Sequence, residues 1–471
     1  MKHSYRIALA ALALFAGCET IRKSKEAQEA LEDKGRDDYV AAESEFLDLT
    51  DLGLEDLVGF GIANRPDMAA CFLELDDARL ALQEIDADAP LLSDNPWHAF
   101  TVDASAGFSE SADRSHGLRW AKHGKASAAL SVDLLLWDWG RNMSRALAQS
   151  ERIIAAEHLM LETGFSIFEE VSGAYFNVLG ADALLEIAYT NELVNAVQVE
   201  RAQRRLDAGE TQLSDLLQAK KNLAQAKEQV VVRKDAVKTA GAELVKVLGL
   251  DVSKANRDDI LADIGNPIDN CVRAFPDTDY PVETAFEYAR TNSPAVRIAR
   301  ARLRASSKMV DAARADLLPR LSLSGSINWT DPLWWWSWGA NLTQNLFSGF
   351  GGVTAVDRAV VAMQKAALDV DESEQQLSRQ LSEAIATRDD ARVACASAEA
   401  TYQAARENFE VVSQQYLVGE CNQLDYADAV NSMVTALGDR VQNFYAAQIA
   451  EARLFRLLGE YPNYIGGEEE Q

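Results

Sequence analysis

The sequence predicts a mainly α-helical chain with a β segment that meets a membrane, built from two copies of one unit. Three observations predict this fold class. Residues 353–458 contain no proline, two parts of the sequence match at a fixed offset, and two separate segments alternate between apolar and polar residues. Each copy is expected to run in the order helix, strand, strand, long helix, turn, helix.

The proline-free stretch predicts a long helical hairpin. Its glycines are Gly419 and Gly438. Proline inside a helix costs about 3 kcal/mol and glycine about 1 kcal/mol relative to alanine, so helix is expected nearly throughout, with a break at Gly419. The first arm, 353–416, would be about 96 Å long at 1.5 Å per residue. Its many charges exclude a membrane-spanning helix.

The repeat is visible at two offsets. Residues 205–216 match 415–426 at an offset of 210, which pairs Gly209 with Gly419. At an offset of 228, Asn64-Arg65-Pro66 matches Asn292-Ser293-Pro294. We therefore divide the chain into a first repeat (51–249), a connector (250–280), a second repeat (281–459) and a C-terminal tail (460–471).

The strands follow from alternation and the helices from the absence of breakers. In the first repeat we expect helices at about 54–87, 140–206 and 212–248 and strands at about 97–109 and 125–137. In the second we expect helices at about 283–316, 353–416 and 422–458 and strands at about 320–330 and 333–346. These strands are long enough for tilted membrane strands of about 9–11 residues.

All nine tryptophans lie in the two alternating segments. Tryptophan favours the headgroup level of a membrane, and aromatic girdles flank the apolar band of outer-membrane barrels. The expected interface aromatics are Trp97, Trp137, Trp139, Trp329, Trp334, Trp336 and Trp338. The alternative is a soluble β-layer with a tryptophan core.

Four strands cannot close a membrane barrel, because the smallest such barrels have eight and lipid tolerates no open edge. Several chains must therefore share one barrel. Two chains would give eight strands with a packed interior, and three would give twelve strands with a lumen.

The N-terminus predicts export. Residues 1–17 combine basic residues with a short apolar stretch, which is typical of a cleaved signal peptide. Leu14-Phe-Ala-Gly-Cys18 resembles a lipobox in which Cys18 is the lipidated first residue, although Phe15 stands where leucine is usual. Ordinary cleavage near Cys18 is the alternative. Residues 18–50 would form an arm that leaves the lipid anchor.

Composition and motifs argue against other classes of protein. The net charge of −27 argues against a nucleic-acid partner. No catalytic triad, phosphate loop or metal-ligand spacing stands out, so we expect no enzyme, cofactor or metal. A Cys71–Cys271 bridge is one alternative in an oxidising periplasm, and free buried thiols are the other.

The doubled plan, the turn at 209–219, the Leu-Gly helix ends at 248–249 and 458–459 and the lipobox resemble the TolC family of outer-membrane efflux proteins. The nearest subgroup is the lipoproteins of tripartite efflux systems. The resemblance implies a homotrimer in the outer membrane of a Gram-negative bacterium. Its twelve-stranded β-barrel would continue as a long α-helical barrel through the periplasm. One departure is Phe350-Gly-Gly352, where the first copy has Trp139-Gly-Arg141.

The resemblance also implies a function. The trimer would be a passive exit duct for small molecules, docked onto a periplasmic adaptor and an inner-membrane pump. Type I protein secretion, which also uses this family, is one alternative, and a periplasmic coiled-coil structural lipoprotein is another.

The resemblance places a periplasmic gate at Asp425 and Asp428, which share a helix face. In a trimer they would form two rings of carboxylates, and such rings favour cations in transit. Alternatively, Asn422 caps the helix and Asp425 stabilises its first turn. The tip turns, expected to contact the adaptor, hold Gly209, Glu210, Gly419 and Glu420.

Overall fold

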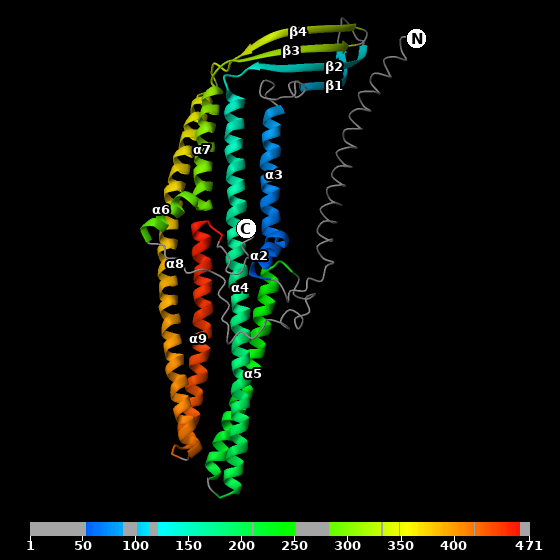
Figure 1. Cartoon of the computed structure of the whole chain (residues 1–471). Helices are drawn as coiled ribbons and strands as arrows, with labels where there is room; N and C mark the ends of the chain where they lie inside the picture. The colour runs from blue at the N-terminus through cyan, green and yellow to red at the C-terminus, as the bar shows by residue number, and fades with distance from the viewer. Residues whose placement is uncertain are drawn as a thin grey trace, which may run out of the picture. The chain divides into compact units, whose positions relative to one another are not determined.

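The computed structural model describes residues 53–87, 101–113, 121–209, 212–250, 282–330, 333–347, 349–418 and 420–461. The first repeat contributes α2 (Leu54–Asn64), α3 (Pro66–Ala87), β1 (Thr101–Asp113), β2 (Ala121–Trp137), α4 (Arg141–Asp207) and α5 (Leu213–Val247). The second contributes α6 (Val282–Asn292), α7 (Pro294–Ala315), β3 (Arg320–Thr330), β4 (Leu333–Thr343), α8 (Gly351–Val418) and α9 (Gln423–Leu458) (Figure 1). The order of elements is therefore the same in both copies.

The two offsets recur in the element boundaries. The bounds of α2 and α3, shifted by 228 residues, are those of α6 and α7, and the start of α4, shifted by 210, is that of α8. The strand-to-helix junctions also share their backbone, because Trp139 and Gly140 have φ values of 58° and 79° and Gly349 and Phe350 have 61° and 65°. Trp139-Gly140 thus corresponds to Gly349-Phe350, which corrects the pairing with Phe350-Gly-Gly352 that the sequence suggested.

The expected continuous helices at 54–87 and 283–316 are wrong, because each is two helices. The first breaks at Arg65, which is extended (φ −74°, ψ 134°), and the second breaks at Ser293. Each of these residues precedes a proline, whose ring disfavours the helical conformation at the residue before it.

The chain divides into two compact units that cut across the repeats. We call Leu75–Ile154 with Ala301–Leu368 the sheet unit, and Asp48–Glu74, Ala155–Arg300 and Asp369–Gln471 the helical unit. Each unit takes segments from both copies. Within the described parts of the chain, no helix has the combination of length and apolar character needed to cross a membrane.

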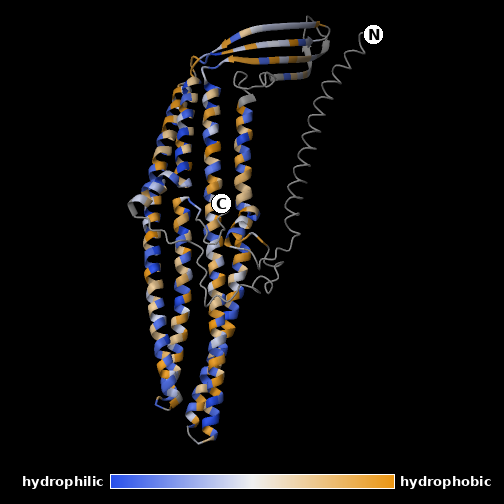
Figure 2. Ribbon diagram, in the orientation of Figure 1, coloured by the Kyte–Doolittle hydropathy of each residue, from blue (hydrophilic) through white to orange (hydrophobic). Residues whose placement is uncertain are grey.

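The sheet unit holds one antiparallel sheet in the order β1-β2-β3-β4. Its register gathers the apolar residues on one face, where Leu130 of β2 lies beside Ile327 of β3, which pairs with Trp336 of β4. The opposite face is mainly polar, with a hydrogen bond of 2.9 Å between the hydroxyls of Ser326 and Ser337 and one of 2.7 Å from Asn341 to Ser324. Apolar and polar colours alternate along the strands (Figure 2).

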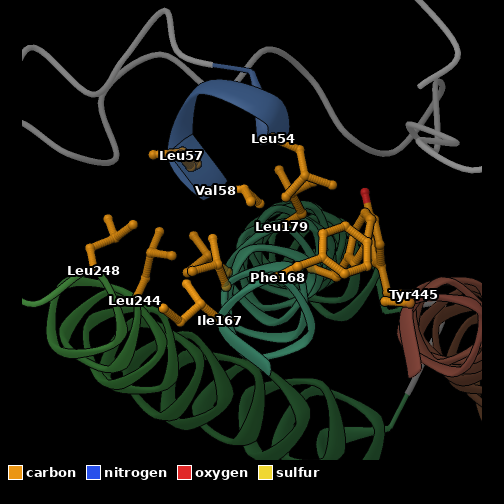
Figure 3. Close-up of a cluster of buried hydrophobic side chains, with 14 of the residues drawn as sticks. Leu54, Leu57, Val58, Ile167, Phe168, Leu179, Leu244, Leu248 and Tyr445 are labelled. Atoms are coloured by element: carbon orange, nitrogen blue, oxygen red, sulfur yellow. The ribbon is translucent and has the colours of Figure 1, made fainter. Parts of the chain in front are cut away.

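The core of the helical unit joins α2, α4, α5 and α9. Phe168 and Phe176 of α4 are fully buried, and Figure 3 shows Phe168 beside Tyr445 of α9, with leucines of α2 above them and leucines of α5 to the left. Each leucine buried in this way stabilises the fold by about 1.5–3 kcal/mol.

Two glycines end α5 and α9 in equivalent places. Gly249 and Gly459 follow α5 and α9 with φ values of 79° and 70°. A Cβ added at Gly249 would lie 3.1 Å from the backbone oxygen of Asn64, and one at Gly459 would lie 3.0 Å from that of Asn292. Both glycines are therefore required by a left-handed helix end and by a close backbone approach.

Candidate functional site

Of the singled-out residues that the structure describes, the tryptophans lie in the sheet or at its junction with α4, and the others lie at the hairpin tips. Cys18, Trp97, Glu210 and Gly419 lie outside the described residues. The lipidation of Cys18 therefore stays a prediction, and so do the adaptor-contact roles of the tip residues.

The sheet brings five of the singled-out tryptophans onto its apolar face. In the register, Trp329 pairs with Trp334, while Trp336 and Trp338 pair with Ile327 and Gly325, and Trp137 pairs with Leu321. The side chains of Trp336 and Trp338 are 72% and 73% exposed. The indoles of Trp336 and Trp338 are therefore not packed in a core of this chain, which argues against the soluble-layer alternative.

Trp139 lies at the junction between β2 and α4. Its φ of 58° is in the left-handed region, which bulky residues rarely adopt. Its indole Nε1 donates a hydrogen bond of 2.8 Å to the carbonyl oxygen of Pro319, and its ring packs edge-on against Trp137 with centroids 6.1 Å apart. The pair therefore ties the end of β2 to the segment that enters β3.

The second hairpin tip carries the two aspartates on the first turns of α9. The side chain of Asn422 accepts a hydrogen bond of 2.8 Å from the backbone N–H of Asp425, so the expected N-cap is present. Asp425 and Asp428 are both exposed, three residues apart along the helix. The cap and an exposed carboxylate pair thus occur together, and the gate stays a prediction.

An aromatic cluster lies directly behind this turn. The rings of Tyr416 and Tyr426 lie 4.8 Å apart and Phe409 lies 6.0 Å from Tyr426, while the Tyr416 hydroxyl hydrogen-bonds Gln423. Burial raises the pKa of Tyr426. The cluster fixes the start of α9 against α8 and so fixes the direction in which the aspartates project.

The first repeat also reaches this cluster. The guanidinium of Arg205, on α4, lies 5.6 Å from the ring centroid of Tyr416, which is cation–π distance. None of these residues belongs to a motif that indicates function in the sequence. Arg205 and Tyr416 are two hundred residues apart in the sequence, so no local pattern could pair them.

The first hairpin tip has a similar extended backbone at its N-cap, where Gln212 (φ −91°, ψ 156°) corresponds to Asn422 (φ −88°, ψ 170°), but different side chains. Gly209 has a φ of 76°, as a turn glycine should. Gln212 occupies the N-cap of α5 without a side-chain cap hydrogen bond, and Gln218 stands where the second copy has Asp428.

The structure decides between a disulfide and a free thiol for one of the two cysteines in question, Cys71. Cys71 is a buried free thiol whose sulfur lies 3.2 Å from the Thr163 hydroxyl. Cys71 is therefore a free buried thiol, as one of the two alternatives predicted. Cys271 lies outside the described residues. Among the residues that the structure describes, no group of three or more histidine, cysteine or acidic side chains could hold a metal ion.

Comparison with known proteins gives a family match over most of the chain. The model of the outer membrane efflux protein family matches residues 62–250 and 286–460. The chain is 22% identical over 342 residues to the outer membrane efflux protein BepC of Brucella suis, covering 71% of this chain and 72% of BepC. It is 26% identical over 331 residues to the alkaline protease secretion protein AprF of Pseudomonas aeruginosa, covering 67% of this chain and 64% of AprF.

The fold is also similar to that of a solved structure. A crystal structure of a membrane protein from Pseudomonas aeruginosa superposes with a TM-score of 0.72 and 23% identity, covering 86% of this chain and 93% of that one. At this identity the likeness shows the fold.

Proposed function

The chain belongs to the outer membrane efflux protein family, and we propose that it is the passive exit duct of a tripartite efflux system. The family and the fold are those of channels and transport proteins rather than enzymes. Small molecules would enter at the periplasmic helix tips and leave through the outer membrane.

The observation that carries this proposal is the sheet. One face is apolar and rich in exposed tryptophan, the other is mainly polar, and within the described residues β1 and β4 each pair with one neighbour only. An open edge is not tolerated in lipid. Copies of the chain that join β4 to β1 would close a barrel with its apolar face toward lipid and its polar face toward a lumen, and three copies would give twelve strands.

The helix tips supply the proposed gate and docking surface. In a trimer, Asp425 and Asp428 would form two rings of three carboxylates at the narrow end of the duct. Like charges held close together repel, and an acidic ring favours cations. Gly209, Glu210, Gly419 and Glu420 lie in the two tip turns, where a periplasmic adaptor would bind and connect the duct to an inner-membrane pump.

Co-purification from outer membranes after mild cross-linking tests this function. We expect a heat-resistant trimer that retains a periplasmic adaptor and an inner-membrane pump. A monomer that stays in solution without detergent would contradict the proposal and would favour the periplasmic structural lipoprotein.

Type I protein secretion is the second candidate, because AprF is named for the secretion of alkaline protease. The pump that co-purifies decides between the two. A pump encoded for small-molecule export supports efflux, whereas a pump dedicated to a secreted protein supports secretion.

A further inference from the structure

One tryptophan of the sheet lies on its polar face. Trp335 and Trp336 are neighbours in β4, and successive residues of a strand point to opposite faces. Trp335 therefore shares a face with Ser337 and Asn341, and its side chain is 54% exposed. Tryptophan on the apolar face is explained by its preference for the headgroup level of a membrane. That preference gives no reason for an indole on the face turned away from lipid.

The indole of Trp335 is also unpartnered. The rings of Trp329 and Trp334 lie 6.2 Å apart on the apolar face, whereas Trp335 has no hydrogen bond, ring contact or cation–π contact with any residue that the structure describes. Its cross-strand neighbour Asn328 donates a hydrogen bond of 2.8 Å to Ser326 instead. The face of the Trp335 ring is therefore available to a ligand.

Two carboxylates lie on the same face, in the rows that follow toward the helices. The register places Trp335 in one row with Asn328 and Ser105. The next row holds Asp103, and the row after it holds Asp133. Successive rows on one face are about 7 Å apart along a strand, and both aspartates are exposed.

The basic residues of this face lie farther from the indole. Arg320, at the helix end of β3, is paired with Asp316 at 2.5 Å. In the paired strands, the nearest basic residue on the other side of Trp335 is Lys125, whose register position is two rows away, toward the end of β1. The wall beside Trp335 is therefore acidic, as is the whole chain with its net charge of −27.

Closing the barrel brings the indole and a carboxylate onto adjoining strands. When β4 of one copy pairs with β1 of the next, Trp335 lies beside the strand that carries Asp103 of that copy, and adjoining strands are about 4.8 Å apart. The positions that follow Asp103 on this face of β1 are Ser105 and Gly107, which are too small to cover an indole. The ring would therefore face an open lumen, with a carboxylate on the neighbouring strand.

From this arrangement we propose that Trp335 binds flat organic cations as they pass through the barrel, with Asp103 of the next copy supplying the opposite charge. A cation within about 6 Å of a tryptophan ring is attracted by the face of that ring, and the acidic wall disfavours anions. The inference rests on the proposed duct function and deepens it by naming a class of ligand. The carboxylate rings at the tips are the narrow point of the duct, so they would still set the selectivity among inorganic ions.

Block of single-channel current in planar bilayers by N-methylacridinium, added at the sheet end, tests the site. We expect reversible block of the wild type, and a half-blocking concentration about five-fold higher in Trp335→Ala. The matched control is Trp336→Ala, which removes the same side chain from the opposite face and should be blocked like the wild type. Acridine, which has the same rings but no charge at mildly alkaline pH, should block more weakly than N-methylacridinium.

Three further variants separate binding from folding. Trp335→Phe keeps an aromatic ring and should give an intermediate half-blocking concentration. Trp335→Leu keeps an apolar side chain without a ring and should behave like Trp335→Ala. Asp103→Asn should weaken block by about two-fold, because it removes the opposite charge.

Equal block in Trp335→Ala and Trp336→Ala, wild-type block in Trp335→Leu, or equal block by acridine and N-methylacridinium would overturn the proposal. The open-channel current without blocker reports on the duct function separately. A channel that conducts without block that depends on Trp335 contradicts this inference alone, whereas a protein that conducts no current contradicts the duct function itself.

Discussion

The two helical hairpins share their order of elements but differ in the side chains that follow their tips. Both long helices, α4 and α8, lead into tips that align at an offset of 210, and both shorter partners, α5 and α9, end at a left-handed glycine. At the start of α9, Asn422 forms a side-chain cap and the aspartate pair follows, whereas the start of α5 has neither. We therefore infer that residues common to both copies maintain the fold. Residues that occur in only one copy are the candidates for a specific function.

The largest expected effect is on conduction. Replacing Asp425 and Asp428 with alanine should raise single-channel conductance in planar bilayers, because the side chains at the constriction become smaller. It should also nearly abolish cation selectivity, because the negative charge at the constriction is removed. Asparagine at both positions should lower selectivity with little change in conductance.

The first copy provides the matched control for this gate. Changing Asp215 and Gln218 to alanine should leave selectivity near that of the wild type. Equal effects from the two pairs would show that the tips are functionally equivalent and would place the gate elsewhere.

The next effect is on stability and should be similar in both copies. Gly249→Ala and Gly459→Ala each place a side chain at a positive φ, which costs about 1–2 kcal/mol. Each also adds a close contact with the backbone at the end of a short helix, at Asn64 of α2 for Gly249 and at Asn292 of α6 for Gly459. Thermal unfolding followed by circular dichroism should show a lower Tm for both variants. An unchanged Tm in Gly459→Ala would contradict this prediction and would mean that the end of α9 adjusts to the added side chain without cost.

The smallest effect concerns the caps. Asn422→Ala should cost about 1 kcal/mol, because it removes the side-chain acceptor at the start of α9. Gln212→Asn should stabilise α5 by a comparable or smaller amount, because it supplies the missing cap. Chemical denaturation measures both changes, and a loss of stability in Gln212→Asn would contradict the comparison.

Much of the fold could be predicted because its signals are local or repeated. The absence of proline predicted helix over 353–416, which lies within α8, and the alternation predicted the strand at 320–330, whose bounds are those of β3. The break before Pro66 was missed because propensity favours helix on both sides of it, while the proline constrains only the preceding residue.

Less of the candidate site than of the fold could be predicted from the sequence. The aspartate pair is a local pattern and could be found. The cluster of Tyr416, Tyr426 and Arg205 joins segments that are distant in the chain. Such contacts depend on how the two copies pack against each other, and no periodicity encodes this packing.

The central claim is that the tryptophan-bearing face of the sheet meets lipid in a shared barrel. Neighbouring residues of β4 test it, because Trp336 lies on the apolar face and Trp335 on the opposite one. Single-tryptophan variants retaining only one of these residues should be reconstituted into vesicles of brominated phospholipid. We expect strong fluorescence quenching of Trp336 and weak quenching of Trp335. Equal quenching of the two, or none at Trp336, would contradict it.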